Sequence, residues 1–338
     1  MKADAARRRR LAAWMALVIG LGLAAGLATG SAGFSPGAFW ADLQGGDAAL
    51  LLGQIRAPRT LGAALVGALL GLAGAISQGL FRNPLADPYL LGSASGAALG
   101  VVLVLAAASL GGHSLGLATA MWIERVGLVS AAFAGALAGV LLTLMLARGA
   151  VQTLRLLLAG VVVGVVLGAV SDLITVASPD ALRGKQVFML GSTSFLGWDA
   201  LALLAAGLAP LLWLAWRHAR ALDALTLGED SAASLGLDLG AVRLRLVLML
   251  SLGTALAVSQ AGLVAFVGLV APHLVRRNAP GAHGWLLLGS AAMGAALLLV
   301  ADVISRALIA PEELPVGVVT AVLGGVYLFR LLRQRTAP

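Results

Sequence analysis

The chain of 338 residues has no cysteine, and charged and aromatic residues make up only 11% and 5% of it. The absence of cysteine excludes disulfides, thiolate metal sites and cysteine nucleophiles, and it leaves the redox compartment open. Hydrophobic residues make up 60% of the sequence, and the mean hydropathy is +0.98. A soluble domain of this composition would expose a large apolar surface and aggregate. The chain is therefore predicted to be an integral membrane protein.

The apolar runs favour helices over strands. They lack the alternation with period two that a membrane β-barrel needs, and the 44 glycines suit helices that pack closely in lipid. A helix crosses the hydrocarbon core with about 20 apolar residues. The predicted fold class is all-α, a polytopic membrane protein of about ten transmembrane helices. The predicted spans are residues 11–33, 59–80, 92–111, 121–147, 155–175, 199–217, 244–262, 263–274, 284–305 and 315–331, of which the eighth is the shortest.

Basic residues predict the orientation of these spans. With the amino terminus in the cytoplasm, 17 of the 23 lysines and arginines fall in cytoplasmic segments, which places both termini inside. The net charge of +8 then reflects membrane orientation and not nucleic-acid binding. Arg7–Arg10 and the apolar run that follows also resemble a secretory signal, but the run from Leu11 to Phe34 exceeds the roughly 7–15 residues of a signal core. The predicted outer side keeps Arg56, Arg59, Arg125, Arg183, Lys185 and Arg306.

The sequence offers no catalytic or nucleotide-binding motif. A phosphate-binding loop ends in Gly-Lys-Ser/Thr, whereas the one Gly-Lys pair, Gly184 and Lys185, precedes Gln186. The four histidines lack the spacing of metal ligands, and no cofactor is predicted. Ion-coupled carriers place ionisable residues near the bilayer midplane. The candidates here, Asp172 and Asp302, lie toward the outer ends of their spans, which favours passage of a bulky solute over a proton relay.

Four separated motifs carry a family resemblance. They are R-A-P-R-T to G-L-F-R-N-P-L-A-D-P-Y-L-L-G-S-A-S-G within 56–96, L-T-L-G-E-D-S-A-A-S-L-G-L at 225–237, G-L-V-A-P-H-L-V-R-R at 268–277, and A-D-V-I-S-R to E-E-L-P-V-G-V-V-T within 301–320. In this order and spacing they resemble the permease subunits of ABC importers for iron chelates (ferric siderophores), haem and cobalamin.

The resemblance covers essentially the whole chain and implies a single transmembrane permease domain over residues 1–338. It also implies a homodimer with a translocation path along the dimer axis in the cytoplasmic (inner) membrane. Two copies of a separate ATP-binding subunit would bind below, and a periplasmic substrate-binding protein would dock above. The chain itself would move substrate without hydrolysing ATP.

Three arginines on the outer side are predicted to bind a partner. Arg56, Arg59 and Arg306 lie on the side that the positive-inside bias depletes, although interfacial arginines that snorkel are an alternative. The resemblance implies that they form salt bridges with glutamates of the binding protein. Such exposed pairs contribute about 0.2–1 kcal/mol each and set encounter rate and register. Asp302 precedes Arg306 by four residues on the same helical face and is predicted to hold its guanidinium.

The inner side carries a predicted gate. Two prolines within 81–91 must break the helix there, and a tight cytoplasmic reversal is the simplest interpretation. The resemblance adds a cytoplasmic gate formed by Asn83 and Leu85, with Thr153 at the start of the fifth span. Leu154 stands where relatives can carry a small hydroxyl residue, so its role in the gate is left open.

The loop at 225–239 is the predicted contact with the ATPase. It is too polar to cross the membrane, yet it gives a short helix an apolar side. The resemblance implies a coupling helix that rests in a cleft of the ATPase, with the glycines at its ends and Glu229 favoured by the helix dipole. The residues concerned are Gly228, Glu229, Asp230, Ala232, Ala233, Leu235 and Gly236.

The predicted function is an importer permease for an iron complex, haem or a ferric siderophore. A cobalamin importer is the first alternative. The chain offers no dedicated iron or cobalt ligand that would distinguish these substrates. An ion-coupled secondary carrier is a second alternative, and a structural membrane anchor is a third.

Overall fold

The computed structural model describes residues 2–30, 33–34, 37, 50–110, 117–150 and 152–335. Residues 31–32 of the first predicted span and residue 111 of the third lie outside the described residues. The side chain of Arg125 also lies outside them.

The described chain folds into helices with one short strand pair. The strands β1 and β2 are antiparallel and join Thr29 to Phe34 and Gly30 to Gly33. The elements are α1 (Lys2–Ala28), β1 (Thr29–Gly30), β2 (Gly33–Phe34), the π-helix η1 (Leu52–Arg56), α4 (Ala57–Leu80), α5 (Ser93–Leu110), α6 (Leu117–Leu146), α7 (Thr153–Ala177), α8 (Pro179–Leu190), α9 (Trp198–Arg217), α10 (Ala219–Thr226), α11 (Glu229–Ser234), α12 (Leu239–Ala261), α13 (Val267–Asn278), α14 (His283–Ala307) and α15 (Val316–Arg335).

Seven helices of the described chain are long and apolar enough to cross a membrane, and two shorter apolar helices, Ser93–Ser109 and Val316–Leu331, accompany them. This confirms the all-α membrane fold. The predicted eighth span corresponds to α13, which has 12 residues and begins after Phe266 in the left-handed region at φ 67°. At 1.5 Å per residue, α13 is about 18 Å long and too short to cross a core of about 30 Å by itself.

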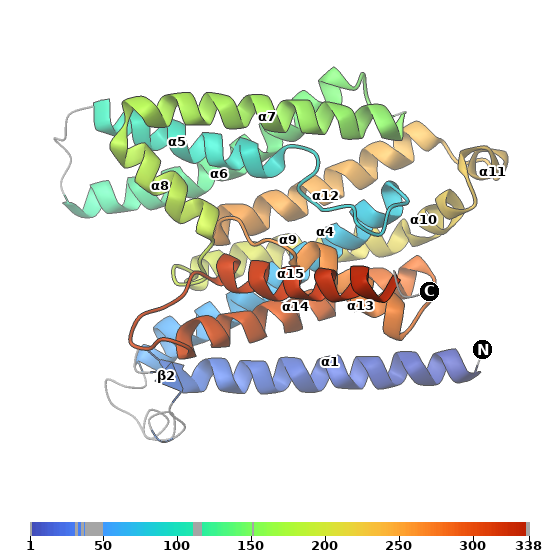
Figure 1. The fold of residues 1–338 in the computed structure, drawn as a ribbon, viewed down its shortest axis with the longest axis horizontal. Helices are drawn as coiled ribbons and strands as arrows, with labels where there is room; N and C mark the ends of the chain where they lie inside the picture. Colours follow the sequence, from blue (N-terminus) through green and yellow to red (C-terminus); the bar gives the residue numbers. More distant parts are fainter. Residues whose placement is uncertain are drawn as a thin grey trace.

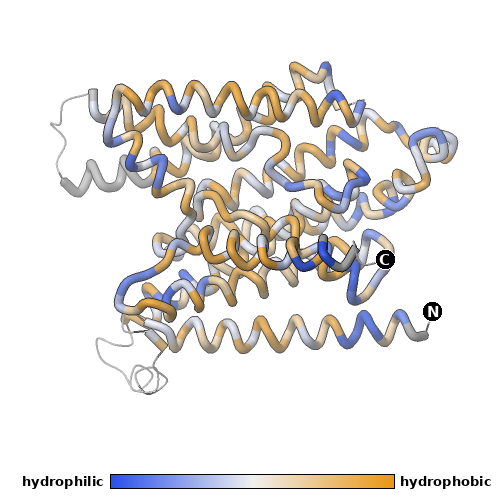
Figure 2. The backbone as a smooth tube through the Cα atoms, in the orientation of Figure 1, coloured by the Kyte–Doolittle hydropathy of each residue, from blue (hydrophilic) through white to orange (hydrophobic). Residues whose placement is uncertain are grey.

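The long helices run side by side, with α1 along one flank of the bundle and α7 along the other (Figure 1). We call the end that holds Lys2, Arg335 and α11 the inner end, and the opposite end, with β1 and β2, the outer end. Both ends of the described chain therefore lie on one side, as predicted. Hydrophilic residues gather on the first turns of α1 and on the connections at the inner end (Figure 2).

The core is centred on α4, whose most apolar stretch is 83% buried. Glycines let this helix touch its neighbours through backbone atoms. A Cβ on Gly71 would lie 2.1 Å from the carbonyl oxygen of Ser290 in α14, and one on Gly74 would lie 1.7 Å from that of Gly268 in α13. The helices α5 and α6 approach each other in the same way. Close glycine packing, predicted from composition, is therefore confirmed.

The outer connector after the fifth predicted span contains a helix that the sequence did not lead us to expect. Ser178 begins α8 by accepting a hydrogen bond from the Ala181 amide at 3.4 Å, and Pro179 occupies the first turn. An ion pair of 2.5 Å between Lys185 and Asp172 ties α8 to α7. Asp172, one of the two candidates for ion coupling, is thus an exposed structural partner of α8.

Candidate functional site

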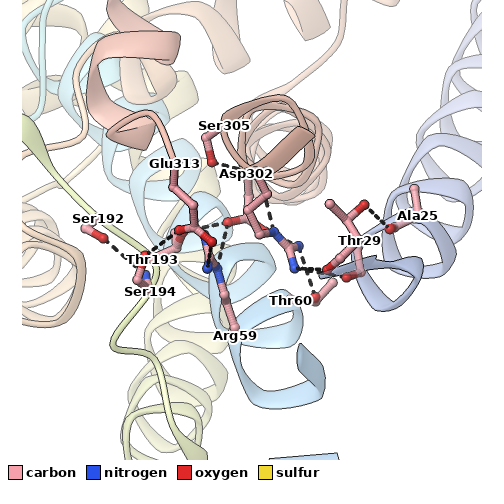
Figure 3. Close-up of polar contacts among 12 residues, drawn as sticks. Ala25, Thr29, Arg59, Thr60, Ser192, Thr193, Ser194, Asp302, Ser305 and Glu313 are labelled. Carbon is pink, nitrogen blue, oxygen red and sulfur yellow. Dashed lines mark hydrogen bonds and ion pairs between the residues drawn. The ribbon is translucent and has the colours of Figure 1, made fainter. Parts of the chain in front are cut away.

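Asp302 of α14 is the centre of a buried charge cluster at the outer end (Figure 3). Its carboxylate accepts from Arg59 Nε of α4 at 3.3 Å and from Arg306 Nη2, one turn along α14, at 2.5 Å. The Thr193 hydroxyl donates to the same carboxylate at 2.5 Å. None of the Asp302 surface is exposed. The predicted pairing of Asp302 with Arg306 is confirmed, and Arg59 is a second partner that the sequence did not indicate.

Glu313 is the outermost acid of this cluster. Its side chain is 32% exposed, and it accepts from Arg59 Nη1 at 2.8 Å while the Ser194 hydroxyl donates to its other oxygen at 2.9 Å. Burial raises the pKa of Glu313, but the hydrogen bond and charge of Arg59, together with the Ser194 bond, outweigh burial and leave the pKa below its ordinary value. Two carboxylates thus balance two guanidiniums, which a buried cluster requires.

Arg306 also fastens α1 to the bundle. Its Nη1 donates to the carbonyl oxygens of Gly26 and Thr29 at 3.0 and 3.1 Å, and its Nη2 donates to the Thr60 hydroxyl of α4 at 3.3 Å. The first of these carbonyls lies in the last turn of α1, where carbonyls have no partner within the helix and attract cations. A Cβ on Gly26 would lie 2.4 Å from the Thr60 side chain, so the contact depends on glycine.

The three arginines predicted to dock a partner converge on one small cavity. Arg56, Arg59 and Arg306 line a space of about 180 Å³ together with Glu313. The expectation that these arginines form exposed pairs is wrong for Arg59 and Arg306, which are only 7% and 3% exposed because Asp302 draws both inward. Arg56 is partly exposed. Their contact with a binding protein stays a prediction.

At the inner end, α11 forms the short helix that the sequence predicts. Gly228 at φ 107° precedes it and Gly236 at φ 82° follows it, as expected for glycines that end a helix. Glu229 pairs with the buried Arg243 of α12 at 2.6 Å and with Arg82, just beyond α4, at 3.4 Å. The helix is therefore clamped to α12 and to the turn that follows α4.

The predicted apolar side of α11 is divided between core and surface. Ala232 is fully buried, whereas Leu227 and Leu235, next to the two ends of the helix, are 66% and 65% exposed. Ala233 and Asp230 are also exposed. The helix thus has an exposed leucine next to each of its ends, outside the bundle.

Two of the predicted gate residues, Asn83 and Leu85, lie together, and the third, Thr153, belongs to another element. Asn83 accepts from the Leu85 amide at 2.9 Å within the reversal after α4, and Leu85 is 50% exposed. Thr153 begins α7, and the neighbouring Leu154 is 70% exposed. Of these four residues, only Asn83 lines the large cleft at the inner end.

That cleft has a volume of about 860 Å³ and a basic lining that includes Arg82, Arg276 and Arg277. Arg276 donates to the Gln78 side chain at 2.8 Å. His273, Arg276 and Arg277 of the G-L-V-A-P-H-L-V-R-R segment lie in the last six residues of α13 and line the cleft. The motif therefore marks the cleft, although the shape of the cleft was not predictable.

The chain is similar in sequence and in fold to known transport proteins. The hemin transport system permease protein HmuU of Yersinia pestis is 42% identical over 285 residues, 83% of each chain. The vitamin B12 import system permease protein BtuC of Salmonella typhi is 38% identical over 335 residues, 97% of each chain. A solved structure of a metal-chelate type ABC transporter in an inward-facing conformation shares the fold, with a TM-score of 0.83 and 24% identity over 96% of this chain and 99% of that one. The profile of the FecCD transport family matches residues 16–334, and the chain belongs to that family.

Proposed function

We propose that this chain is the membrane permease subunit of an ATP-driven importer in the cytoplasmic membrane. In this proposal it works as a homodimer with two ATP-binding subunits and a periplasmic binding protein, and it hydrolyses no ATP itself. The observation that carries the proposal is α11, a short helix outside the bundle. Its neighbouring leucines are exposed, and Glu229 clamps it to α12 and to the turn that follows α4. Family membership and relatives named as transport permeases support the same function.

The clamp gives a path for coupling. Displacement of α11 by the ATPase would act on Arg243 and Arg82 through Glu229. Arg82 follows α4, whose 24 residues extend for about 36 Å. Arg59 sits in the first turn of that helix, in the outer charge cluster. One rigid helix therefore links the proposed ATPase contact to the proposed docking surface.

Docking is proposed to use the outer cavity. Arg56 is partly exposed there, while Arg59 lies beneath Glu313. A glutamate of the binding protein would meet Arg56 at this cavity and fix encounter rate and register, with about 0.2–1 kcal/mol for that pair. Arg59 and Arg306 would line the cavity behind it. On the inner side, Asn83, Leu85 and Thr153 are proposed to form the cytoplasmic gate.

The proposed substrate is an iron complex, haem or a ferric siderophore. Cobalamin is supported equally by the relatives, since one is named for hemin and another for vitamin B12. The ion-coupled carrier is the less favoured alternative. Asp302, a candidate for ion coupling, is instead bonded to two arginines and a threonine in the outer charge cluster.

The test is uptake into proteoliposomes that contain the chain and the ATPase encoded beside it. Haem, a ferric siderophore and cobalamin are compared, each with its binding protein and with or without internal ATP. ATP-dependent accumulation of one ligand supports the importer and identifies its substrate. Accumulation that needs an ion gradient and no ATP would favour the secondary carrier instead.

A further inference from the structure

A groove of about 500 Å³ lies between α1 and α14 on the flank of the bundle. On α1 its apolar residues recur at intervals of three and four, so they share one helical face. The same spacing occurs on the facing side of α14. The apolar residues that line it are Leu11, Trp14, Met15 and Val18 on α1, and Met293, Ala296, Leu297 and Val300 on α14.

The inner end of this groove is basic. Arg7 and Arg10 line it, and both side chains are exposed. They belong to a run of four arginines, and the acid in the first turn of this helix is Asp4. The lining thus changes from cationic to apolar within one turn of α1, and Figure 2 shows the same change along that helix.

The position of the groove matches the inner leaflet of a bilayer. Only 22% of the most apolar stretch of α1 is buried in the chain, so the helix offers most of its surface to lipid. Trp14 is 65% exposed one turn beyond Arg10, at the level where amphipathic aromatic residues meet headgroups. From Arg10 to Val18 the helix rises about 12 Å, enough to accompany much of an acyl chain.

We propose that this groove binds an anionic glycerophospholipid of the cytoplasmic leaflet. Its phosphate accepts hydrogen bonds from the guanidiniums of Arg7 and Arg10, and one acyl chain lies between α1 and α14. Guanidinium is the side-chain group best suited to bind phosphate oxygens in pairs, and basic pockets at the cytoplasmic ends of membrane helices select anionic lipids. The inference does not depend on the transported substrate.

Such a lipid would complete the attachment of α1. At the outer end, Arg306 holds the carbonyls of Gly26 and Thr29. At the inner end, Arg8 donates to the Pro280 carbonyl at 3.2 Å. Between these points the groove separates parts of α1 from α14, and an acyl chain fills that space with apolar contacts.

The experiment uses the full chain in detergent and native mass spectrometry with phosphatidylglycerol or phosphatidylcholine. The double variant Arg7→Gln/Arg10→Gln removes both charges, and Arg330→Gln/Arg333→Gln on α15 is the matched control. We expect the wild type and the control to retain phosphatidylglycerol, with phosphatidylcholine bound far less. The groove variant should bind phosphatidylglycerol about thirtyfold more weakly, from the attraction of two arginines for an anionic headgroup.

A second variant separates lipid binding from loss of fold. Val300→Trp fills the groove from its exposed side, and it should reduce retention while the protein elutes as the wild type does in gel filtration. A photoreactive phosphatidylglycerol with its reactive group on an acyl chain should label peptides of α1 and α14. Equal retention by the wild type and the Arg7/Arg10 variant, equal binding of both lipids, or labelling elsewhere would overturn the proposal.

Discussion

The outer charge cluster leads to a quantitative prediction for Asp302→Asn. The substitution keeps the shape of the side chain but removes the negative charge between Arg59 and Arg306, which are only 7% and 3% exposed. Removing one partner of a buried ion pair costs about 3–5 kcal/mol, because the remaining charge is left without compensation. Arg59 retains Glu313 and the asparagine still accepts one hydrogen bond, so we expect the lower end, about 3 kcal/mol.

The assay is thermal unfolding of the purified chain, in which fluorescence-detected gel filtration measures the folded fraction that remains after heating. A loss of about 3 kcal/mol corresponds to a Tm lower by roughly 6 °C, at about 2 °C per kcal/mol for a large domain. The matched comparison adds Asp302→Asn to an Arg306→Gln background. There Asp302→Asn should cost less than in the wild type, because the guanidinium of Arg306 that it would leave unpaired is already absent. A Tm within about 2 °C of the wild type for Asp302→Asn alone would refute the reasoning.

Three further predictions concern other parts of the chain. Because the pKa of Glu313 is lowered, its pairing with Arg59 stabilises the fold above the ordinary carboxyl pKa, and this stability is lost as the pH falls through the lowered pKa. Glu313→Gln should therefore flatten the acid limb of a Tm–pH profile. An unchanged limb would contradict this. Glu229→Gln weakens the two ion pairs of α11, so it should lower the amount of solute transported per ATP while basal ATPase activity stays unchanged. The control Asp230→Asn, at an exposed position, should not lower transport per ATP. Identical ratios of transport to ATP hydrolysis in the two variants would count against the clamp. Gly71→Ala drives a methyl group into a carbonyl of α14 and should cost about 1–3 kcal/mol in thermal unfolding, while Gly20→Ala, with open space around it, should be neutral.

Local sequence signals predicted much of the fold. Long apolar runs gave the helices, and the glycines at 228 and 236 gave the ends of α11, because positive φ at a helix end favours glycine. Asp302 and Arg306 were predictable as a pair because four residues in a helix place two side chains on one face.

Long-range pairing was not predictable in the same way. Thr193 and Glu313 reach the outer cluster from positions far along the chain, and nothing in the local pattern of either residue shows which arginine it meets. The burial of Arg59 follows from those partners, so its position on the outer side suggested a more exposed guanidinium than it has. The bounds of the short α13 were also difficult to predict. Its apolar residues begin after an irregular turn and are followed by polar residues.

The central claim is that ATP hydrolysis on a partner subunit drives solute through this chain. The most direct measurement is uptake into proteoliposomes that contain the chain with its ATPase, compared with the same chain and a hydrolysis-deficient ATPase, both with internal ATP and binding protein and without any ion gradient. The account predicts accumulation of the solute only with the active ATPase. Equal accumulation with the inactive ATPase, or accumulation that appears only when an ion gradient is imposed, would contradict it.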